Sequence, residues 1–163
     1  MADKLLQHTQ LDGIKEYSAA LDTLCELAER DLYFFDRNLE GVGFNTEARY
    51  SMLHRFLLAS PAHKLYVLVY DTHYLTTLCP RMMLLLRQFS GRMTIRQVPN
   101  SLQHIYTPFA VADDAHTVRR FHFDDPRGVF EQYDASQARV LKACFLEMWA
   151  ASHHTLSPDR LGL

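Results

Sequence analysis

Apolar and polar residues recur along this chain with the two periods that distinguish helices from strands. Between residues 14 and 30, apolar residues return every three or four positions, which predicts an amphipathic opening helix. The aromatic and aliphatic run at residues 32–35 and the apolar run LYVLVY at residues 65–70 both predict buried strands. Helical spacing between these strands ends before Pro61, so we expect a second helix there.

The second half of the chain continues this alternation. A helix that begins at Pro80 and ends at Gly91 is followed by a strand at residues 93–98. The next segments are predicted as two antiparallel strands, a surface loop rich in turn-forming residues, and a long last helix with a capping residue: residues 109–112, 118–123, 124–133 and the stretch from Asp134.

This order of elements predicts an α/β fold with a mixed, mostly parallel sheet, helices on both faces and a late antiparallel hairpin. We expect a single domain over residues 1–163, with the opening helix in residues 1–31, the core in residues 32–152 and a frayed tail in residues 153–163. The two adjacent histidines of this tail point to different sides of the chain, so they predict no metal site.

Composition and charge narrow the range of functions. The 17 lysines and arginines are outnumbered by 19 aspartates and glutamates, so we do not expect a nucleic-acid-binding protein. The 3 cysteines lie far apart and predict neither a disulfide framework nor a metal cluster. The N-terminus lacks the apolar core of a signal peptide, and no stretch approaches the roughly 20 apolar residues that span a bilayer. We therefore expect a cytoplasmic protein without membrane contact.

Five arginines nevertheless give nucleic-acid binding some support. They are Arg87, Arg92, Arg96, Arg119 and Arg120.

Ionisable and polar residues follow several of the predicted strands. Ligands of open α/β sheets bind beyond the carboxyl ends of the strands, so these residues are candidates for a site. Carboxylates that converge with His73 or His104 suit acid–base chemistry or divalent-metal binding, but the same residues are typical of turns and helix caps. No histidine pair has the spacing of metal ligands, and we predict no metal site. The residues at the strand ends are Asp36-Arg37, Asp71-Thr72-His73, Pro99-Asn100 and Asp113-Asp114.

A glycine-containing loop, NLEGVG at residues 38–43, lies between a predicted strand and a predicted helix. Glycines in this position let backbone N–H groups approach a phosphate, and the loop resembles the acetyl-coenzyme-A loop of the N-acetyltransferase superfamily. Asn38 departs from the Gln or Arg that opens that pattern, and too little chain precedes the loop for the strands of that fold. A flexible glycine turn is the alternative reading, and we predict no cofactor.

The region around the late hairpin resembles the H-x-K-x4-D signature of the phospholipase D superfamily, whose half-domain alternates strands and helices before that motif. With Asp113 as the aspartate, Tyr106 stands in the place of the histidine and Pro108 in the place of the lysine. His104 lies two residues too early for the histidine position. The resemblance covers residues 32–152 and is to the uncharacterised bacterial modules that occur alone or C-terminal to acetyltransferase domains.

The resemblance implies a degenerate half-domain. In the family, one histidine is the nucleophile, a second protonates the leaving group, and lysines hold the phosphate charge. A phenol, which ionises at about pH 10, is a poor substitute for an imidazole, and proline has neither charge nor donor. With Tyr106 and Pro108 in these places, we expect no enzymatic activity. Because catalytic phospholipase D enzymes combine two half-domains, the resemblance also implies a homodimer.

We therefore expect a non-catalytic phospholipase D-like module that binds a partner protein or a small anionic ligand. Two alternatives remain open. One is a phosphodiesterase with a rearranged centre that uses His104 and His73, and the other is a coenzyme-A-dependent, acetyltransferase-associated protein that uses the glycine loop. The predicted ligand crevice consists of Asp36, Asp71, His73, Arg81, His104, Tyr106 and Asp113.

Overall fold

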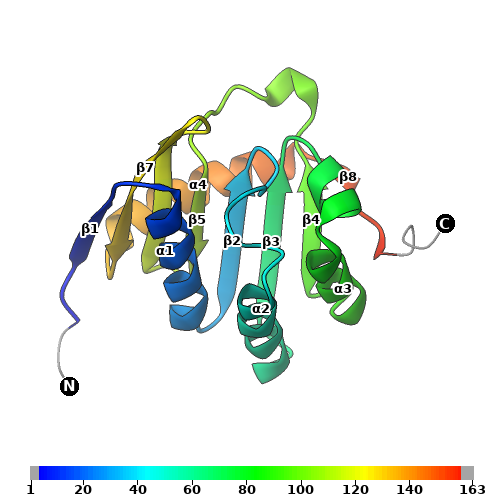
Figure 1. Cartoon of the computed structure of the whole chain (residues 1–163), viewed down its shortest axis with the longest axis horizontal. Coiled ribbons are helices and arrows are strands. Elements are labelled where there is room, and N and C mark those ends of the chain that lie inside the picture. Colours follow the sequence, from blue (N-terminus) through cyan, green and yellow to red (C-terminus); the bar gives the residue numbers. More distant parts are fainter. Residues whose placement is uncertain (1–3, 159–163) are drawn as a thin grey trace.

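The computed structural model describes residues 4–158, which form an eight-stranded sheet with helices on both faces (Figure 1). The strands are β1 (Gln7–Leu11), β2 (Asp31–Asp36), β3 (Lys64–Val69), β4 (Met93–Gln97), β5 (Phe109–Ala112), β6 (His116–His122), β7 (Asp125–Gln132) and β8 (His154–Thr155). The helices are α1 (Ile14–Leu27), α2 (Glu47–Ala59), α3 (Pro80–Gln88) and α4 (Ala135–Ala150), with a π-helical turn η1 (Tyr74–Leu78) and a 3-10 turn η2 (Asn100–Leu102).

The strand order across the sheet is β1-β7-β6-β5-β2-β3-β4-β8. β2 pairs with β3 and β3 pairs with β4 in parallel. The other neighbouring strands are antiparallel. β2 is therefore the strand at which a parallel half of the sheet meets an antiparallel half.

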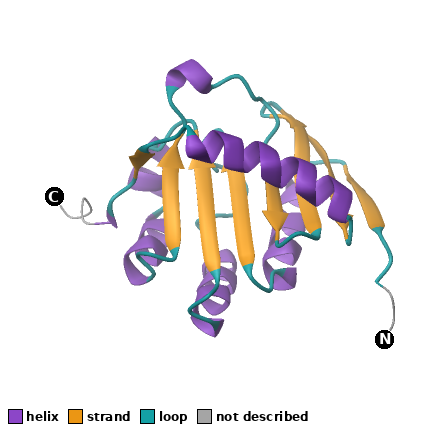
Figure 2. Ribbon diagram, turned by 180° about the vertical axis from the view of Figure 1, so that it is seen from behind, coloured by secondary structure: helices purple, strands orange, loops and turns teal. Residues whose placement is uncertain are grey.

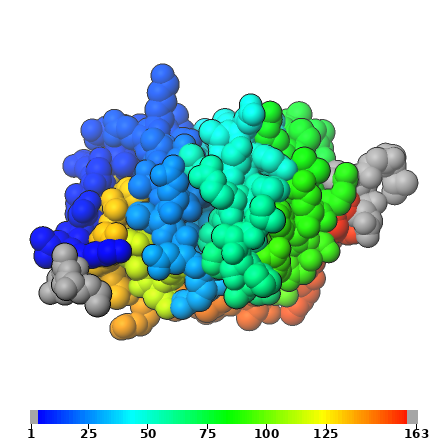
Figure 3. All heavy atoms as spheres, turned by 90° about the horizontal axis from the view of Figure 1, so that it is seen from below, coloured from blue at the N-terminus to red at the C-terminus, as the bar shows by residue number. Residues whose placement is uncertain are grey.

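Alternating side chains of β2 face two separate parts of the core. Leu32 and Phe34 pack into the cluster beneath α1, α2 and α3, whereas Tyr33 and Phe35 pack into the cluster beneath α4. Figure 2 shows α4 lying across its face of the sheet, and Figure 3 shows α1, α2 and α3 side by side on the opposite face. Within residues 4–158, no helix has the length and apolarity required to cross a membrane. Burial on both faces explains why the interior of β2, residues 32–35, is aliphatic and aromatic, with aspartates only at its two ends.

The fold class predicted from the sequence is confirmed. The sheet is mixed, helices cover both faces, and the late strands are antiparallel. The parallel part is smaller than predicted, because parallel pairing is confined to the strands that alternate with α2 and α3 along the chain.

Three segments differ from the sequence prediction. Residues 124–133, expected as a surface loop, contain β7, which pairs with both β1 and β6. The N-terminal segment contains β1 as well as the opening helix. His154, expected in a frayed tail, pairs with Gln97 of β4 as part of β8. These strands lack a local apolar pattern, and their pairing with neighbours defines them.

Gly128 explains why β7 resembles a loop in the sequence. Pro126 and Gly128 are turn-forming residues, yet both lie within the strand. Gly128 pairs with Arg120, where the register between β6 and β7 becomes irregular. A Cβ atom at Gly128 would collide with the carbonyl oxygen of Arg119. The glycine is therefore needed for the close approach of two strands, not for a turn.

We predict that Gly128→Ala lowers the free energy of unfolding by about 3 kcal/mol, because the backbone of β6 must move to admit the added methyl group. Gly13→Ala is the matched control, since a Cβ atom there meets nothing within 4 Å. Its expected cost is below about 1 kcal/mol, as for other N-cap replacements by Ala. Urea unfolding followed by circular dichroism measures both values, and equal costs would contradict this explanation of Gly128.

Candidate functional site

A cleft lies beyond the carboxyl ends of the parallel strands β2, β3 and β4. Residues 98–108 arch over these strand ends (Figures 1 and 2). The cleft has a volume of about 520 Å³, which is within the range of small-molecule sites. The position agrees with the rule that open α/β sheets bind ligands beyond the carboxyl ends of their strands. The cleft is lined by Arg37, Tyr70, Asp71, Gln97, Asn100, Gln103, Tyr106 and Phe123.

Backbone and side-chain hydrogen bonds fix the walls of this cleft. The carbonyl oxygen of Arg37 accepts bonds from the N–H groups of Tyr70 and Asp71, both at 2.9 Å, and so joins the ends of β2 and β3. The Tyr70 hydroxyl donates to the carbonyl oxygen of Ile105 at 2.6 Å and accepts from the Ile105 N–H at 3.0 Å. The Gln103 amide donates to the carbonyl oxygen of Val98 at 2.9 Å. These bonds hold the arching loop against the sheet.

Arg37 provides the positive charge of the cleft. Its guanidinium lies 5.0 Å from the centre of the Phe123 ring, and its Nη2 atom is 3.3 Å from the Asp124 carboxylate. Both partners of this ion pair are largely exposed, so it is weak and an anionic ligand can replace it. The planar guanidinium is therefore placed to donate paired hydrogen bonds to a phosphate or carboxylate.

Tyr106 provides an exposed aromatic surface at the same place. Its ring stacks on that of His122, with centroids 5.7 Å apart and an angle of 14° between the planes. The Nδ1 atom of His122 accepts a hydrogen bond from the N–H of Asp124 at 3.0 Å, which leaves Nε2 as the protonated nitrogen of the neutral ring. Tyr106 is 53% exposed, so its outer face is open to a ligand.

The remaining polar groups of the cleft suit hydrogen bonding rather than proton transfer. Asp71 accepts a bond from the backbone N–H of His73 at 2.8 Å. Gln97 donates to the carbonyl oxygen of Tyr70 at 3.1 Å. Among residues 4–158, no group of three or more His, Cys, Asp or Glu side chains is arranged to hold a metal ion. The arrangement can bind an anion through Arg37 and a hydroxyl or amino group through Asp71.

The structure brings together two of the seven residues predicted for the crevice, Asp71 and Tyr106. Asp36, His73, Arg81, His104 and Asp113 do not line the cleft. His73 and His104 are both exposed, and no hydrogen bond joins them in the described part of the chain. Arg81 donates from Nη1 to the carbonyl oxygen of Asn45 at 2.8 Å and so holds the loop before α2.

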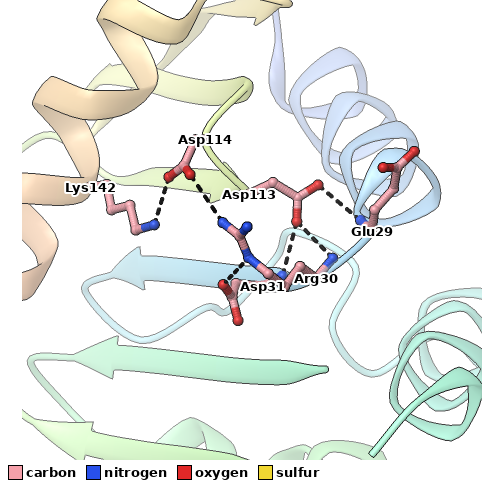
Figure 4. A network of polar contacts seen from close by, with 6 residues as sticks. All are labelled: Glu29, Arg30, Asp31, Asp113, Asp114 and Lys142. Atoms are coloured by element: carbon pink, nitrogen blue, oxygen red, sulfur yellow. Dashed lines mark hydrogen bonds and ion pairs between the residues drawn. The ribbon is translucent and has the colours of Figure 1, made fainter. Parts of the chain in front are cut away.

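Asp113 lies at the start of β2, at the opposite end of the strands from the cleft. Its place in the predicted crevice is therefore wrong. The residue follows β5, which runs antiparallel to β2. Its carboxylate accepts bonds from the backbone N–H groups of Glu29, Arg30 and Asp31 at 2.8 to 2.9 Å, as Figure 4 shows. It lies seven positions after Tyr106 in the sequence, and an extended chain covers about 23 Å over that length. The residue has a structural role at the start of β2.

Asp36 lies near the cleft edge but on the α1 face of the sheet. It is 4% exposed and accepts a bond from the Arg37 N–H at 2.6 Å. An Nη2 atom of Arg120 lies 3.8 Å from its carboxylate, and the Arg120 guanidinium stacks on the ring of Tyr17. Burial raises the pKa of Asp36 to about 6, although Arg120 acts in the opposite direction. The buried Asp36 carboxylate, paired with Arg120, therefore holds the backbone N–H of Arg37 in place.

The glycine loop is a turn that is packed against the body of the fold. Its apolar side chains Leu39 and Val42 are buried, and Gly41 and Gly43 have positive φ angles. A Cβ atom at Gly43 would collide with the guanidinium of Arg49, which is itself 1% exposed. The loop therefore closes over a buried arginine and has no open cradle at Gly43 for a phosphate.

The crevice predicted from the sequence lacks six of the eight residues that line the cleft. Two of them, Arg37 and Asn100, are among the residues noted at the strand ends, and the other four are Tyr70, Gln97, Gln103 and Phe123. Gln97 had a partial signal, because it is a polar residue near the end of the strand predicted over residues 93–98, and it is the last residue of β4 in the structure. Gln103 and Phe123 had none, since they reach the cleft through a long loop and through the end of an antiparallel strand.

Comparison with known proteins gives a family and a fold. A family model described as "Domain of unknown function (DUF7931)" matches residues 13–157. No curated protein matches the sequence.

Solved structures with a similar fold include Nuc from Salmonella typhimurium, described as a phospholipase D family member. It has a TM-score of 0.63 and 10% identity, with 94% of this chain and 99% of that chain covered. Phosphatidylserine synthase from Haemophilus influenzae Rd KW20 has a TM-score of 0.60 and 15% identity, with 94% and 40% covered. The predicted phospholipase D-like fold is confirmed by these likenesses.

TrmBL2, an archaeal chromatin protein whose structure shows a mode of DNA binding, is also similar. The TM-score is 0.66 at 14% identity, and the match covers 91% of this chain. This chain spans about half the length of TrmBL2, since 54% of that chain is covered. The likeness at this identity concerns the fold.

We predict that Asp113→Asn lowers the free energy of unfolding by about 2 kcal/mol, because it removes the charge and one of the two oxygens that accept three backbone bonds. Asn tolerates the positive φ angle of 56° at this position, so the loss reports on the carboxylate. The control is Asp114→Asn, whose exposed ion pairs with Arg30 and Lys142 contribute less than about 1 kcal/mol. Chemical denaturation distinguishes the two, and a smaller cost for Asp113→Asn would contradict the structural role.

Asp36 predicts a specific pH dependence of stability. Its folded-state pKa of about 6 lies above the value of about 4 in an unfolded chain, so the folded protein binds this proton more tightly. The stability that this group contributes is present below about pH 4 and is lost as the pH rises through about 6. We expect the unfolding free energy of the wild type, minus that of Asp36→Asn, to fall by up to about 3 kcal/mol between pH 4 and 7. A difference that stays constant or rises over this range would show that the carboxyl is not destabilised by burial.

Proposed function

Since the chain belongs to the family described as "Domain of unknown function (DUF7931)", whose matched region here has a phospholipase D-like fold, we propose that it is a non-catalytic module that binds a small anionic ligand. The ligand occupies the cleft at the carboxyl ends of the parallel strands. The observation that carries the proposal is the partly exposed Arg37 guanidinium beside the open face of Tyr106, within a cleft of about 520 Å³.

The neighbours of Arg37 refine the chemistry of this ligand. Asp71 repels a ligand that is anionic throughout and favours one that also carries a hydroxyl or amino donor. The amides of Gln97 and Gln103 already bond to backbone carbonyl groups, so they are held in place before a ligand arrives. A phosphorylated sugar, with an anionic group at one end and hydroxyls at the other, has the required combination.

Two features of the cleft support binding without catalysis. In the resembled motif, Tyr106 and Pro108 stand in the places of the nucleophilic histidine and the lysine. Pro108 is buried and supplies no donor, and its carbonyl oxygen already accepts a bond from the Arg120 N–H at 3.0 Å. A phosphodiesterase that uses His73 and His104 requires both groups near one reacting atom, and neither residue lines the cleft.

The two other functions considered from the sequence receive less support. Four of the five arginines that favoured nucleic-acid binding have partners within the fold: Arg92, Arg96, Arg119 and Arg120. An acetyltransferase-associated role requires coenzyme binding at the glycine loop, and that loop is packed against Arg49.

We also propose that the chain forms a homodimer in the cytoplasm. The support for the dimer is the resemblance to a family whose enzymes combine two half-domains. The support for a reducing compartment is that Cys25, Cys79 and Cys144 are all free. Burial raises the pKa of the Cys25 thiol to about 12, which is a property of an unreactive core cysteine.

The ligand proposal predicts that Arg37→Gln weakens binding of ribose 5-phosphate about tenfold, because one charge-assisted contact is lost. Isothermal titration calorimetry at low salt measures the affinity. Arg87→Gln on α3 makes the same change in net charge at an exposed residue outside the cleft, and we expect it to leave the affinity unchanged. Equal losses in the two variants would indicate a general charge effect and would contradict a site at Arg37.

A further inference from the structure

We propose that β1 is the contact between two copies of this chain, which pair antiparallel about a two-fold axis at Thr9 and join their sheets into one. This inference rests on the homodimer proposed above and names its surface. It does not depend on the ligand of the cleft.

β1 is the outer strand at one side of the sheet (Figure 1). One of its edges pairs with β7 in an uninterrupted antiparallel register, and no strand among residues 4–158 pairs with its other edge. Four of its five residues are exposed. Outer strands usually carry a proline, a lysine or a bulge that prevents further pairing, but the sequence QHTQL contains neither proline nor lysine. Its free backbone N–H and C=O groups are open to another strand.

Symmetry fixes the register of such a pair. A two-fold axis perpendicular to the sheet keeps every side chain on its own face, and successive side chains of a strand alternate between the faces. Residues that lie opposite each other in the pair therefore share a face only when the axis passes through one residue of β1, which then lies opposite the same residue of the second copy. With Thr9 in that place, all five residues are paired: Gln7 faces Leu11 of the second copy, and His8 faces Gln10 of the second copy. A two-fold axis at any other residue of β1 would leave part of the strand unpaired.

Exposed apolar residues at the two ends of β1 meet in this register. Leu5 and Leu6 before the strand are 76% and 57% exposed, and Ile14 after it is 37% exposed. Leu5 lies opposite Gly13 of the second copy and therefore beside its Ile14. The same contact occurs twice by symmetry, so the pair covers apolar surface that a single chain leaves in water.

The charges near β1 are also complementary in this register. Lys4 precedes the strand, whereas Asp12 follows it and Glu16 lies in the first turn of α1. Antiparallel pairing brings Lys4 of each copy to the start of α1 of the other copy, where these acidic residues lie. A parallel arrangement would place the two lysines together, so the charge pattern favours the two-fold pair.

The test places a charge on the symmetry axis. In Thr9→Lys or Thr9→Glu, each copy presents the same charge directly opposite its counterpart, and like charges in opposite positions destabilise a strand pair. We expect each variant to have a dimer association constant reduced about tenfold. An equimolar mixture of Thr9→Lys and Thr9→Glu is expected to form a one-to-one heterodimer at wild-type affinity or better. Sedimentation equilibrium, with native mass spectrometry to identify the heterodimer, measures these outcomes.

The control variants are Ser51→Lys and Ser51→Glu, which change the same charge at an exposed position of α2. We expect them to dimerise as the wild type does. Thr9→Cys provides a second measurement that needs no added charge, because opposite Cβ atoms lie about 4.5–5.5 Å apart and can form a disulfide after small adjustments. Mild oxidation should cross-link Thr9→Cys but not Ser51→Cys. Circular dichroism confirms that each variant is folded.

The outcomes separate the inference from the proposal on which it rests. A wild-type chain that stays monomeric at every concentration overturns both the dimer and the β1 contact. A dimer that Thr9→Lys leaves intact, with no cross-link in Thr9→Cys, overturns the β1 contact and leaves the dimer standing. Loss of the dimer in Thr9→Lys with recovery in the mixture supports the two-fold strand pair.

Discussion

The carboxylate of Asp113 connects the two halves of the sheet. It accepts three backbone hydrogen bonds from the segment that enters β2, and it lies in the turn between β5 and β6. β2 is paired in parallel on one side and antiparallel on the other, so its position sets the register of both halves. The ends of β2 and β3, joined by the Arg37 carbonyl, then determine where the cleft lies. Asp113 thus holds the start of β2, and the length of this strand then places Arg37 at the cleft.

Several arginines of this chain are held within the fold, which limits the positive charge of its surface. Arg49 and Arg120 lie in the interior and are held by Asp22 and Asp36, and each guanidinium stacks on an aromatic ring. Arg92 and Arg96 donate to backbone carbonyl groups near the ends of helices. These side chains contribute little positive charge to the surface, whereas the Arg37 guanidinium is partly exposed at the cleft. The chain's slightly negative net charge is consistent with a local anion site and not with a broad basic surface.

The sequence predicts the alternating strands and helices well, because their apolar periodicity is local and strong. It does not predict β7, since Pro126 and Gly128 have the composition of a turn and become a strand through pairing with β6. It places Asp113 wrongly for a simple geometric reason. The segment from Tyr106 to Asp113 runs along the length of β5, from the cleft to the opposite end of the strands, so its two ends cannot share a site. The cleft itself depends on the path of residues 98–108 over the sheet, and the sequence carries no periodic signal for that path.

We propose that the cleft binds a small ligand through its phosphate group and does not hydrolyse phosphodiesters. ³¹P NMR tests both parts directly, with ribose 5-phosphate as the ligand and bis(p-nitrophenyl) phosphate as the probe of hydrolysis. We expect the ribose 5-phosphate resonance to shift or broaden as protein is added, and the diester to yield its monoester no faster than in buffer. Monoester formation that increases with protein concentration, and that Tyr106→Phe abolishes, would show that the cleft is an active site and would overturn the non-catalytic function.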